Sequence, residues 1–427
     1  MKSKKLIALV LSAALTVTAA VISPAITSAT STSSEKSITA TFPYEGQTVS
    51  VVKPHVTNYV NAMKAQATGI ADDYVINDLN GDSVKISDYC RLEYNDGRSK
   101  EVMLAFDAQG FDPSADFVVK FADNEALVGA EEIAATNSYA TVNNLYLDKT
   151  YYWRVEEKTT GIVSPISSFT TNDFVRMMTV DSGTYNLTNV RDFGGRMTES
   201  GKRVKQGIIF RGSELIAENY TNGGGTHYKN LDDTMLDVLK NQLGIAYEVD
   251  LRGAAEANEI TASPLGAGVS YMRVTNGGGG GYAALWNGTE NNAQTDALNG
   301  NVKNKELLKR MFVEAFTNAN EKHVYFHCWG GADRTGTIAF ILGGLLGMSY
   351  TDLIMDYEFT SFAYNYRPHD ETDPNGIYNF PKFIEAIKAS PYYAEGKKLS
   401  AIMKDWMIGA LGMTEKEVET LKNNLLE

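Results

Sequence analysis

The sequence predicts two folded domains of different class, an all-β sandwich followed by an α/β domain. Between residues 41 and 172, runs such as KEVMLAF and ADFVVKF alternate apolar and polar residues with period two, which is typical of half-buried strands. From residue 175 to residue 427, strand-like runs such as GIIFRGSEL and IAYEVDLRG alternate with helical runs such as LDDTMLDVLKNQLG. That alternation indicates a layered α/β domain with a central sheet flanked by helices.

The composition is that of a soluble globular protein. Of the 427 residues, 43% are hydrophobic and 21% are charged, and the formal net charge is −13. A surface this acidic argues against broad electrostatic binding to nucleic acid or to an anionic membrane, although a local basic pocket is still allowed.

The N-terminal segment has the layout of a signal peptide. Three lysines precede the apolar run LIALVLSAALTVTAAVI, and small residues ending at Ala29 follow it. We therefore expect residues 1–29 to be removed and the protein to be secreted. Cleavage in the Ala19–Ala20 region and an uncleaved anchor are the alternatives. No later stretch is apolar enough to cross a membrane, so we expect no stable anchor after cleavage.

The β-rich domain is expected to follow a Ser/Thr-rich spacer at residues 30–40. In LYLDKTYYWRV, period two places Tyr151, Trp153 and Val155 on one face of a strand. The segment NLYLDKTYYWRVEEKTTGIVSPISSFTT resembles the C-terminal half of a fibronectin type III domain, in which a leucine, a tight turn and a tyrosine precede the penultimate strand. Such a domain is a spacer, a brace for the catalytic domain or a module for a protein or cell-surface partner, and the first two are favoured.

The second domain contains the stretch HCWGGADRTG, from His327 to Gly336. It follows the short strand KHVYFHC and precedes TGTIAFILGGLLG, which is apolar almost all round and predicts a buried helix. A strand, a tight loop and a helix N-terminus together make an anion site, because free N–H groups and the helix dipole point into it. The only other cysteine is Cys90, which is expected to lie in the first domain, so Cys328 is predicted to be a free thiol.

A cysteine in such a loop is placed for nucleophilic catalysis. The loop amides, the helix dipole and Arg334 favour a thiolate, which can attack a bound phosphate and form a phosphocysteine. The Thr335 hydroxyl can donate to the sulfur, and His327 can hold the loop's shape. No second cysteine or histidine lies at zinc-ligand spacing. His227, His323 and His369 share no spacing and are expected to be surface or structural residues. The residues expected around the phosphate are Trp329, Gly330, Gly331, Ala332, Thr335 and Gly336.

The pattern His-Cys-x5-Arg-Thr-Gly resembles the signature of the protein tyrosine phosphatase superfamily. NVRDFGGRMTESGKRVKQGIIFRGSEL, YEVDLRG and LGMTEKEVETLKNNLLE are similar to a bacterial family, with secreted members, that has a C-x-x-G-x-D-R loop. The resemblance spans residues 178–427 and implies that Cys328 is the nucleophile and Arg334 the phosphate clamp. It also implies that Arg211 and Arg252 line or brace the pocket, and that no metal or organic cofactor is needed.

The general acid that protonates the leaving group remains open among three aspartates. Asp333 is the loop aspartate to which the resemblance assigns this role, although its side chain could equally cap the next helix. Asp250 ends a predicted strand, where catalytic groups of α/β sheets are found, although it could simply pair with Arg252. Asp296 lies in a glycine-rich loop before Cys328 and could equally be a solvated loop residue.

The predicted function is hydrolysis of phosphomonoesters, most of all of phosphotyrosine type, in proteins, peptides or small molecules. One alternative is an inositol-polyphosphate or phosphoinositide phosphatase, as the family includes dual-specificity and phosphoinositide enzymes. Ala332 argues against it, because many relatives carry lysine there. The other alternative is a catalytically silent phosphate-binding module, against which the intact Cys328 and Arg334 argue.

Overall fold

The computed structural model describes residues 35–77, 84–91, 97–222, 225–257, 260–274, 305–363, 365–371 and 380–427. The predicted signal peptide and Asp296 lie outside these ranges. Among the residues that are described, the helices are all too short or too polar to cross a membrane.

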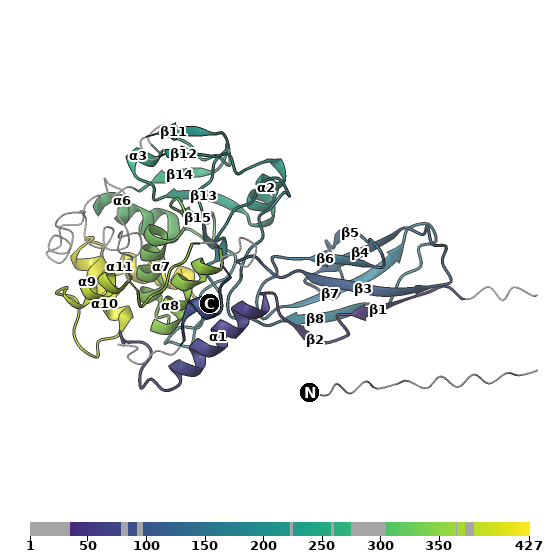
Figure 1. Cartoon of the computed structure of the whole chain (residues 1–427), viewed down its shortest axis with the longest axis horizontal. Helices are drawn as coiled ribbons and strands as arrows, with labels where there is room; N and C mark the ends of the chain where they lie inside the picture. Colours follow the sequence, from purple (N-terminus) through teal and green to yellow (C-terminus); the bar gives the residue numbers. More distant parts are fainter. Residues whose placement is uncertain are drawn as a thin grey trace, which may run out of the picture.

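The N-terminal domain is a β-sandwich of two sheets (Figure 1). One sheet has the order β1–β3–β6 and is antiparallel. The other has the order β2–β8–β7–β4–β5, in which only the β2–β8 pair is parallel. The strands are β1 (Ser37–Phe42), β2 (Gln47–Val49), β3 (Val102–Gln109), β4 (Phe117–Ala122), β5 (Glu131–Ala134), β6 (Tyr139–Val142), β7 (Thr150–Glu157) and β8 (Ser167–Thr171).

The core of the sandwich follows from the alternation in the sequence. Along β7 every second residue is buried, which confirms that Tyr151, Trp153 and Val155 share one face. They pack with Phe121 and Phe169 between the two sheets, and the Tyr151 and Phe169 rings are stacked 5.8 Å apart. Burial of these rings adds large apolar areas to the core that holds the two sheets together.

The second domain is built on a five-stranded sheet of order β14–β13–β15–β10–β9. Neighbouring strands are parallel except for β9, which is antiparallel to β10. A separate hairpin, β11–β12, lies at the top of the domain in Figure 1. The strands are β9 (Arg191–Asp192), β10 (Ile209–Gly212), β11 (Tyr220–Asn222), β12 (Gly225–His227), β13 (Ile245–Asp250), β14 (Ser270–Arg273) and β15 (His323–His327).

Both faces of this sheet are covered, as parallel sheets require. Phe210 and Tyr325 face one core with α2 and its π-helical continuation, whereas Ile209, Val324 and Phe326 face the larger core with α7. The α7 helix is buried along almost its whole length, as predicted. The helices and helical turns are α2 (Asp233–Asp237), η2 (Val238–Gln242), α3 (Ala254–Ala257), α6 (Lys305–Arg310), η3 (Met311–Phe316), α7 (Asp333–Leu346), α8 (Tyr350–Glu358), η4 (Phe359–Ala363), α9 (Phe380–Lys388), α10 (Leu399–Gly409) and α11 (Glu415–Leu425).

Three details differ from the sequence-based expectation. The end of the predicted spacer is strand β1, which pairs with β3. Helix α1 (Pro54–Ala67) and the short turn η1 (Ile86–Asp88) interrupt the region expected to hold only strands. The buried side chains of α1 belong to the core of the second domain, and α1 packs on α8. Cys90, which follows η1, packs against the same core, so it does not lie in the sandwich; both cysteines are free thiols, as predicted.

A segment of the sandwich, Asn144–Asp148, is bound by the second domain. The Arg176 guanidinium donates to the carbonyls of Asn144 (2.7 Å) and Leu145 (3.1 Å) and lies 3.8 Å from the centre of the Tyr146 ring. The Gln206 amide bonds both the N–H (2.9 Å) and the carbonyl (3.2 Å) of Leu147. These contacts make the junction a packed interface and not a free linker.

We expect Gly207→Ala to destabilise this junction. Gly207 has φ +78°, and a Cβ there would overlap the Tyr146 ring. Gly201→Ala is the matched control, because Gly201 has φ +75° and open space around it. The control should lose about 1 kcal/mol of unfolding free energy from backbone strain, and Gly207→Ala about 1–3 kcal/mol more from overpacking. Urea unfolding measures both, and equal losses would contradict a tight junction.

Candidate active site

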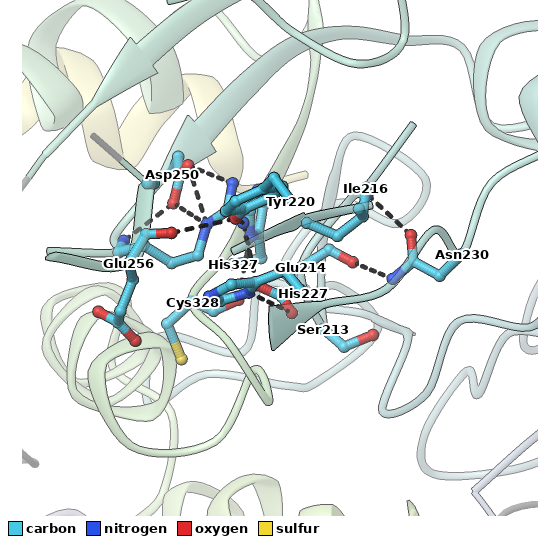
Figure 2. A network of polar contacts seen from close by, with 12 residues as sticks. Ser213, Glu214, Ile216, Tyr220, His227, Asn230, Asp250, Glu256, His327 and Cys328 are labelled. Carbon is cyan, nitrogen blue, oxygen red and sulfur yellow. Dashed lines mark hydrogen bonds and ion pairs between the residues drawn. The ribbon is translucent and has the colours of Figure 1, made fainter. Parts of the chain in front are cut away.

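The stretch from Cys328 to Ala332, here called the Cys loop, joins β15 to α7. Because β15 lies between β13 and β10 and all three are parallel, their carboxyl ends meet below the loop, and His327 is in register with both Gly212 and Asp250. Ligands of open α/β sheets bind at this edge. Figure 2 shows the polar network around Cys328, drawn from these strand ends and the β11–β12 region.

The carbonyl oxygens of the Cys loop are held by groups outside the loop. Glu214 belongs to the segment after β10, Arg211 to β10 itself, and Asn189 to the turn before β9. The bonds run from Glu214 N–H to the Trp329 carbonyl (2.9 Å), from Asn189 Nδ2 to the Gly330 and Gly331 carbonyls (3.0 Å each), and from Arg211 Nη2 to the Gly331 carbonyl (2.7 Å).

This arrangement creates a cradle of amide donors. In a planar trans peptide the C=O and the next N–H point in opposite directions. With three successive carbonyls turned outward, the N–H groups of Gly330, Gly331 and Ala332 therefore face the inner side of the loop. Gly331 has φ +64°, and a Cβ there would overlap the Gly212 carbonyl, so this turn requires glycine. Inward N–H groups before a helix N-terminus bind anions, as the sequence predicted.

The nucleophile candidate lies at the start of this cradle. Cys328 is a free thiol and is 3% exposed. Trp329, its neighbour, is 52% exposed, whereas Ala332, Thr335 and Gly336 are buried. The Thr335 hydroxyl is buried without a hydrogen-bond partner among the described residues, so the predicted bond to the sulfur is not formed in this structure.

Arg334 keeps one edge of its guanidinium for a ligand. Nη1 and Nη2 both bind the Glu256 carboxylate, the latter at 2.8 Å, and Nη1 also contacts the Leu251 carbonyl at 3.3 Å. Of the five N–H groups, this leaves Nε–H and one on Nη2 with no acceptor among the described residues, and these two share an edge. Burial disfavours the charge, but Cys328 and Glu256 raise the pKa of Arg334. The residue therefore stays a cation that can bind two phosphate oxygens.

His327 has the position expected of a loop-orienting residue. It is fully buried, its Nδ1 donates to the Cys328 carbonyl at 3.0 Å, and its Nε2 lies 3.0 Å from Glu248 Oε1. Glu248, Asp250 and His327 could hold a metal, since their ligand atoms lie within 4.8 Å of one another. Each of them is already bonded to protein groups, and the Arg252 cation lies against Asp250, so ion pairing accounts for the cluster.

The structure corrects the predicted role of Asp250 as an acid. Arg252 binds it through Nε (2.9 Å) and Nη2 (2.7 Å), and both side chains are fully buried. Burial would raise the pKa of Asp250, but His327 and Arg252 outweigh it and lower that pKa. A general acid must carry a proton, so this ionised carboxylate does not suit the role.

Arg211 and Arg252 are likewise braces and do not line the pocket. Both are fully buried. Arg211 binds Asp356 and the Cys-loop carbonyls, while Arg252 binds Asp250 and Glu214. Of the two roles that the resemblance implied, lining or bracing the pocket, these contacts are those of a brace.

Asp333 is the first residue of α7, and its side chain is 17% exposed. Arg367 binds it with both forks, Nε to Oδ1 at 2.8 Å and Nη2 to Oδ2 at 2.9 Å. It does not cap the helix, since the N-cap position is Ala332. Asp296, the third candidate acid, lies outside the described residues.

Several residues that shape the site were not found from the sequence. Asn189 and Glu214 lie in segments that resemble the family, NVRDFGG and FRGSEL, and polar residues at strand ends could have pointed to them. Glu256, Asp356 and Arg367 carry no such signal, because only the folded chain brings them to Arg334, Arg211 and Asp333.

The comparison with protein families agrees with this site. The family model described as the tyrosine phosphatase family matches residues 184–427, more than half of the chain. Among solved structures, the core catalytic domain of a PP-IP phosphatase from S. cerevisiae, in complex with citrate, is similar at 13% identity. That alignment has a TM-score of 0.23 and covers 40% of this chain and 78% of the yeast chain. No curated protein matches the chain.

We expect Asn189→Asp to damage the Cys loop without unfolding the protein. The new carboxylate keeps the oxygen that accepts from Arg191 but replaces the donor to two loop carbonyls with an acceptor. Displacing the loop should lower kcat/KM for an aryl phosphate by about 100-fold. Asn189→Gly is the matched control, since glycine tolerates the φ of +60° and adds no repulsion, so its loss should be smaller. Wild-type activity in the Asp variant would contradict the clamping role.

Proposed function

The chain belongs to the tyrosine phosphatase family, and we propose that it hydrolyses phosphomonoesters of phosphotyrosine type through a phosphocysteine intermediate. The observation that carries this proposal is the meeting of three features in one loop. The Cys328 thiol, the inward amides and the unoccupied edge of Arg334 are what a thiolate nucleophile and a phosphate dianion need.

The reaction has two steps. The Cys328 thiolate attacks phosphorus, the P–O bond to the leaving group breaks, and the leaving oxygen takes a proton. Water then attacks the phosphocysteine, which releases inorganic phosphate and the thiolate. The loop amides and Arg334 stabilise the equatorial oxygens in both transition states. The proposed steps use no metal or organic cofactor.

Asp333 is our choice for the group that protonates the leaving oxygen. It is partly exposed at the end of the Cys loop, whereas Asp250 is fully buried and held by Arg252. Arg367 binds both oxygens of the Asp333 carboxylate, so the role requires that pair to open when substrate binds.

We also propose that the protein is exported and that its sandwich is a fibronectin type III domain that braces the enzyme. The signal-peptide pattern supports the first statement. For the second, the Tyr146 N–H donates to the Tyr151 hydroxyl at 2.9 Å, a tyrosine corner of the kind found in such sandwiches. The packed junction at Asn144–Asp148 suits a brace better than a spacer.

One observation favours the inositol-phosphate alternative. Arg367 places a cation at Asp333, next to the Cys loop. The neighbouring loop residue, Ala332, supplies no cation of its own. A substrate with several phosphates could bind this cation. A panel of phosphotyrosine peptides and inositol phosphates, compared by kcat/KM, separates the two substrate classes.

We expect Cys328→Ser to abolish hydrolysis of para-nitrophenyl phosphate by the mature protein with EDTA present. Serine keeps the shape but stays a neutral hydroxyl where cysteine ionises. Cys90→Ser is the matched control and should keep wild-type activity, because Cys90 lies outside the Cys loop, in the segment that follows η1. Activity that survives in Cys328→Ser would contradict the thiol mechanism, and an inactive wild type under reducing conditions would favour the silent binding module.

We expect the effect of Asp333→Asn to depend on the leaving group. An alkoxide needs a proton to leave, whereas para-nitrophenolate is a stable anion and needs little help. The variant should therefore lose about 100-fold or more in kcat for an alkyl phosphate and far less for para-nitrophenyl phosphate. Equal losses for both esters would assign Asp333 a structural role in the loop.

A further inference from the structure

Three aromatic side chains stand in a row beside the nucleophile, and we call them the aromatic wall: Tyr220, His227 and Trp329. Tyr220 and His227 come from the hairpin β11–β12, and their rings are stacked with centroids 4.5 Å apart and planes 7° apart. The Trp329 ring follows at 5.7 Å from His227, tilted by 48°. Figure 2 shows Tyr220 and His227 in the same polar network as Cys328.

The wall is held in place by the groups that hold the Cys loop. The Glu214 carboxylate accepts from His227 Nδ1 at 2.9 Å, and the Glu214 backbone N–H donates to the Trp329 carbonyl. Arg252 donates to both Glu214 (2.9 Å) and the Tyr220 hydroxyl (2.8 Å). Burial, together with nearby carboxylates, raises the pKa of Tyr220 to about 12, so the ring stays neutral. Tyr220 and His227 are therefore fixed before substrate arrives, and the Trp329 backbone is held beside them.

Exposure identifies which ring a ligand can reach. His227 is 2% exposed and Trp329 is 52% exposed. The indole thus has the His227 ring beside it and about half of the residue's surface open to solvent. His227 Nε2 is buried and bonded to none of the described residues, so the flat ring is what this histidine adds to the wall. Trp329 directly follows Cys328, and it carries the exposed side chain of the Cys loop, whereas Cys328 and Ala332 are buried. It is therefore the loop side chain that a group attached to a phosphate at the sulfur can meet at the rim.

We propose that the aromatic wall binds the aromatic ring of an aryl phosphomonoester, which makes Trp329 a specificity-determining residue. This inference rests on the proposed function and names the substrate class of that site. Ring stacking contributes beyond simple burial, and an alkyl phosphate cannot stack. The faces of the rings carry partial negative charge, and the Glu214 carboxylate lies behind them. Neither attracts a further anionic group of the substrate. The wall therefore favours an aryl ester over a polyphosphate.

The test compares a ligand that has a ring with one that lacks it, on the full mature chain. We would measure kcat/KM for a phosphotyrosine peptide and the inhibition constant of inorganic phosphate. Trp329→Ala should lower kcat/KM by about threefold to tenfold, as expected for loss of one aromatic pair, with inhibition by phosphate unchanged. Trp329→Phe keeps a ring and should retain most of the activity. Tyr228→Ala, at a 70% exposed tyrosine outside the wall, is the matched control and should change neither quantity.

Each of the other outcomes contradicts the proposal that the aromatic wall binds the substrate ring. If Trp329→Ala weakens phosphate inhibition as much as peptide turnover, Trp329 supports the loop and does not bind the ring. If both quantities stay at wild-type values while hydrolysis still depends on Cys328, the wall is refuted and the phosphatase stands. If the wild type shows no hydrolysis that depends on Cys328, the proposed function fails first, and the wall fails with it.

Discussion

The site depends on one buried carboxylate, that of Asp356 on α8. Arg191, Arg196 and Arg211 all bind it, and the three arginines together with Asp356 are almost completely buried. Burial alone would raise the pKa of Asp356, but the three guanidinium groups lower it far below its usual range. Without Asp356 the three cations would repel one another, and Arg211 would no longer be held at the Gly331 carbonyl of the Cys loop.

The same network explains why the sandwich is bonded to the second domain. Arg176 binds sandwich carbonyls on one side and the buried Asp192 carboxylate at 2.9 Å on the other. The Asp192 carboxylate also accepts hydrogen bonds from the N–H groups of Gly194 and Gly207, and its neighbour Arg191 binds Asp356. The sandwich thus contacts the elements that set the loop's shape. Helix α1 adds a second brace, since the Tyr59 hydroxyl bonds Glu358, and Glu358 holds His369 near Arg367.

How much could be predicted from the sequence depended on whether a feature is local. The Cys loop could be predicted, because its strand, turn and helix are contiguous and each has its own pattern. The alternation along β7 and the all-apolar α7 were confirmed for the same reason. Apart from the local Asp250–Arg252 pair, the partners of the charged residues could not be predicted, since topology alone brings Glu256 to Arg334. Helix α1 was missed because it lies between strands in sequence yet buries its apolar face on the other domain.

The ion pairs around the loop explain why phosphate recognition is left to the backbone amides and one edge of Arg334. Asp333 is paired with Arg367, Glu256 with Arg334, and Asp250 with Arg252, so each pair adds little net charge at the loop's mouth. Such pairs fix geometry at the expense of free charge. A phosphate therefore binds to backbone N–H groups and to one edge of Arg334. These groups recognise the shape and charge of the phosphate, but they do not distinguish one esterified alcohol from another. Selection of that alcohol has to come from the rim, where Trp329 is the exposed side chain of the loop.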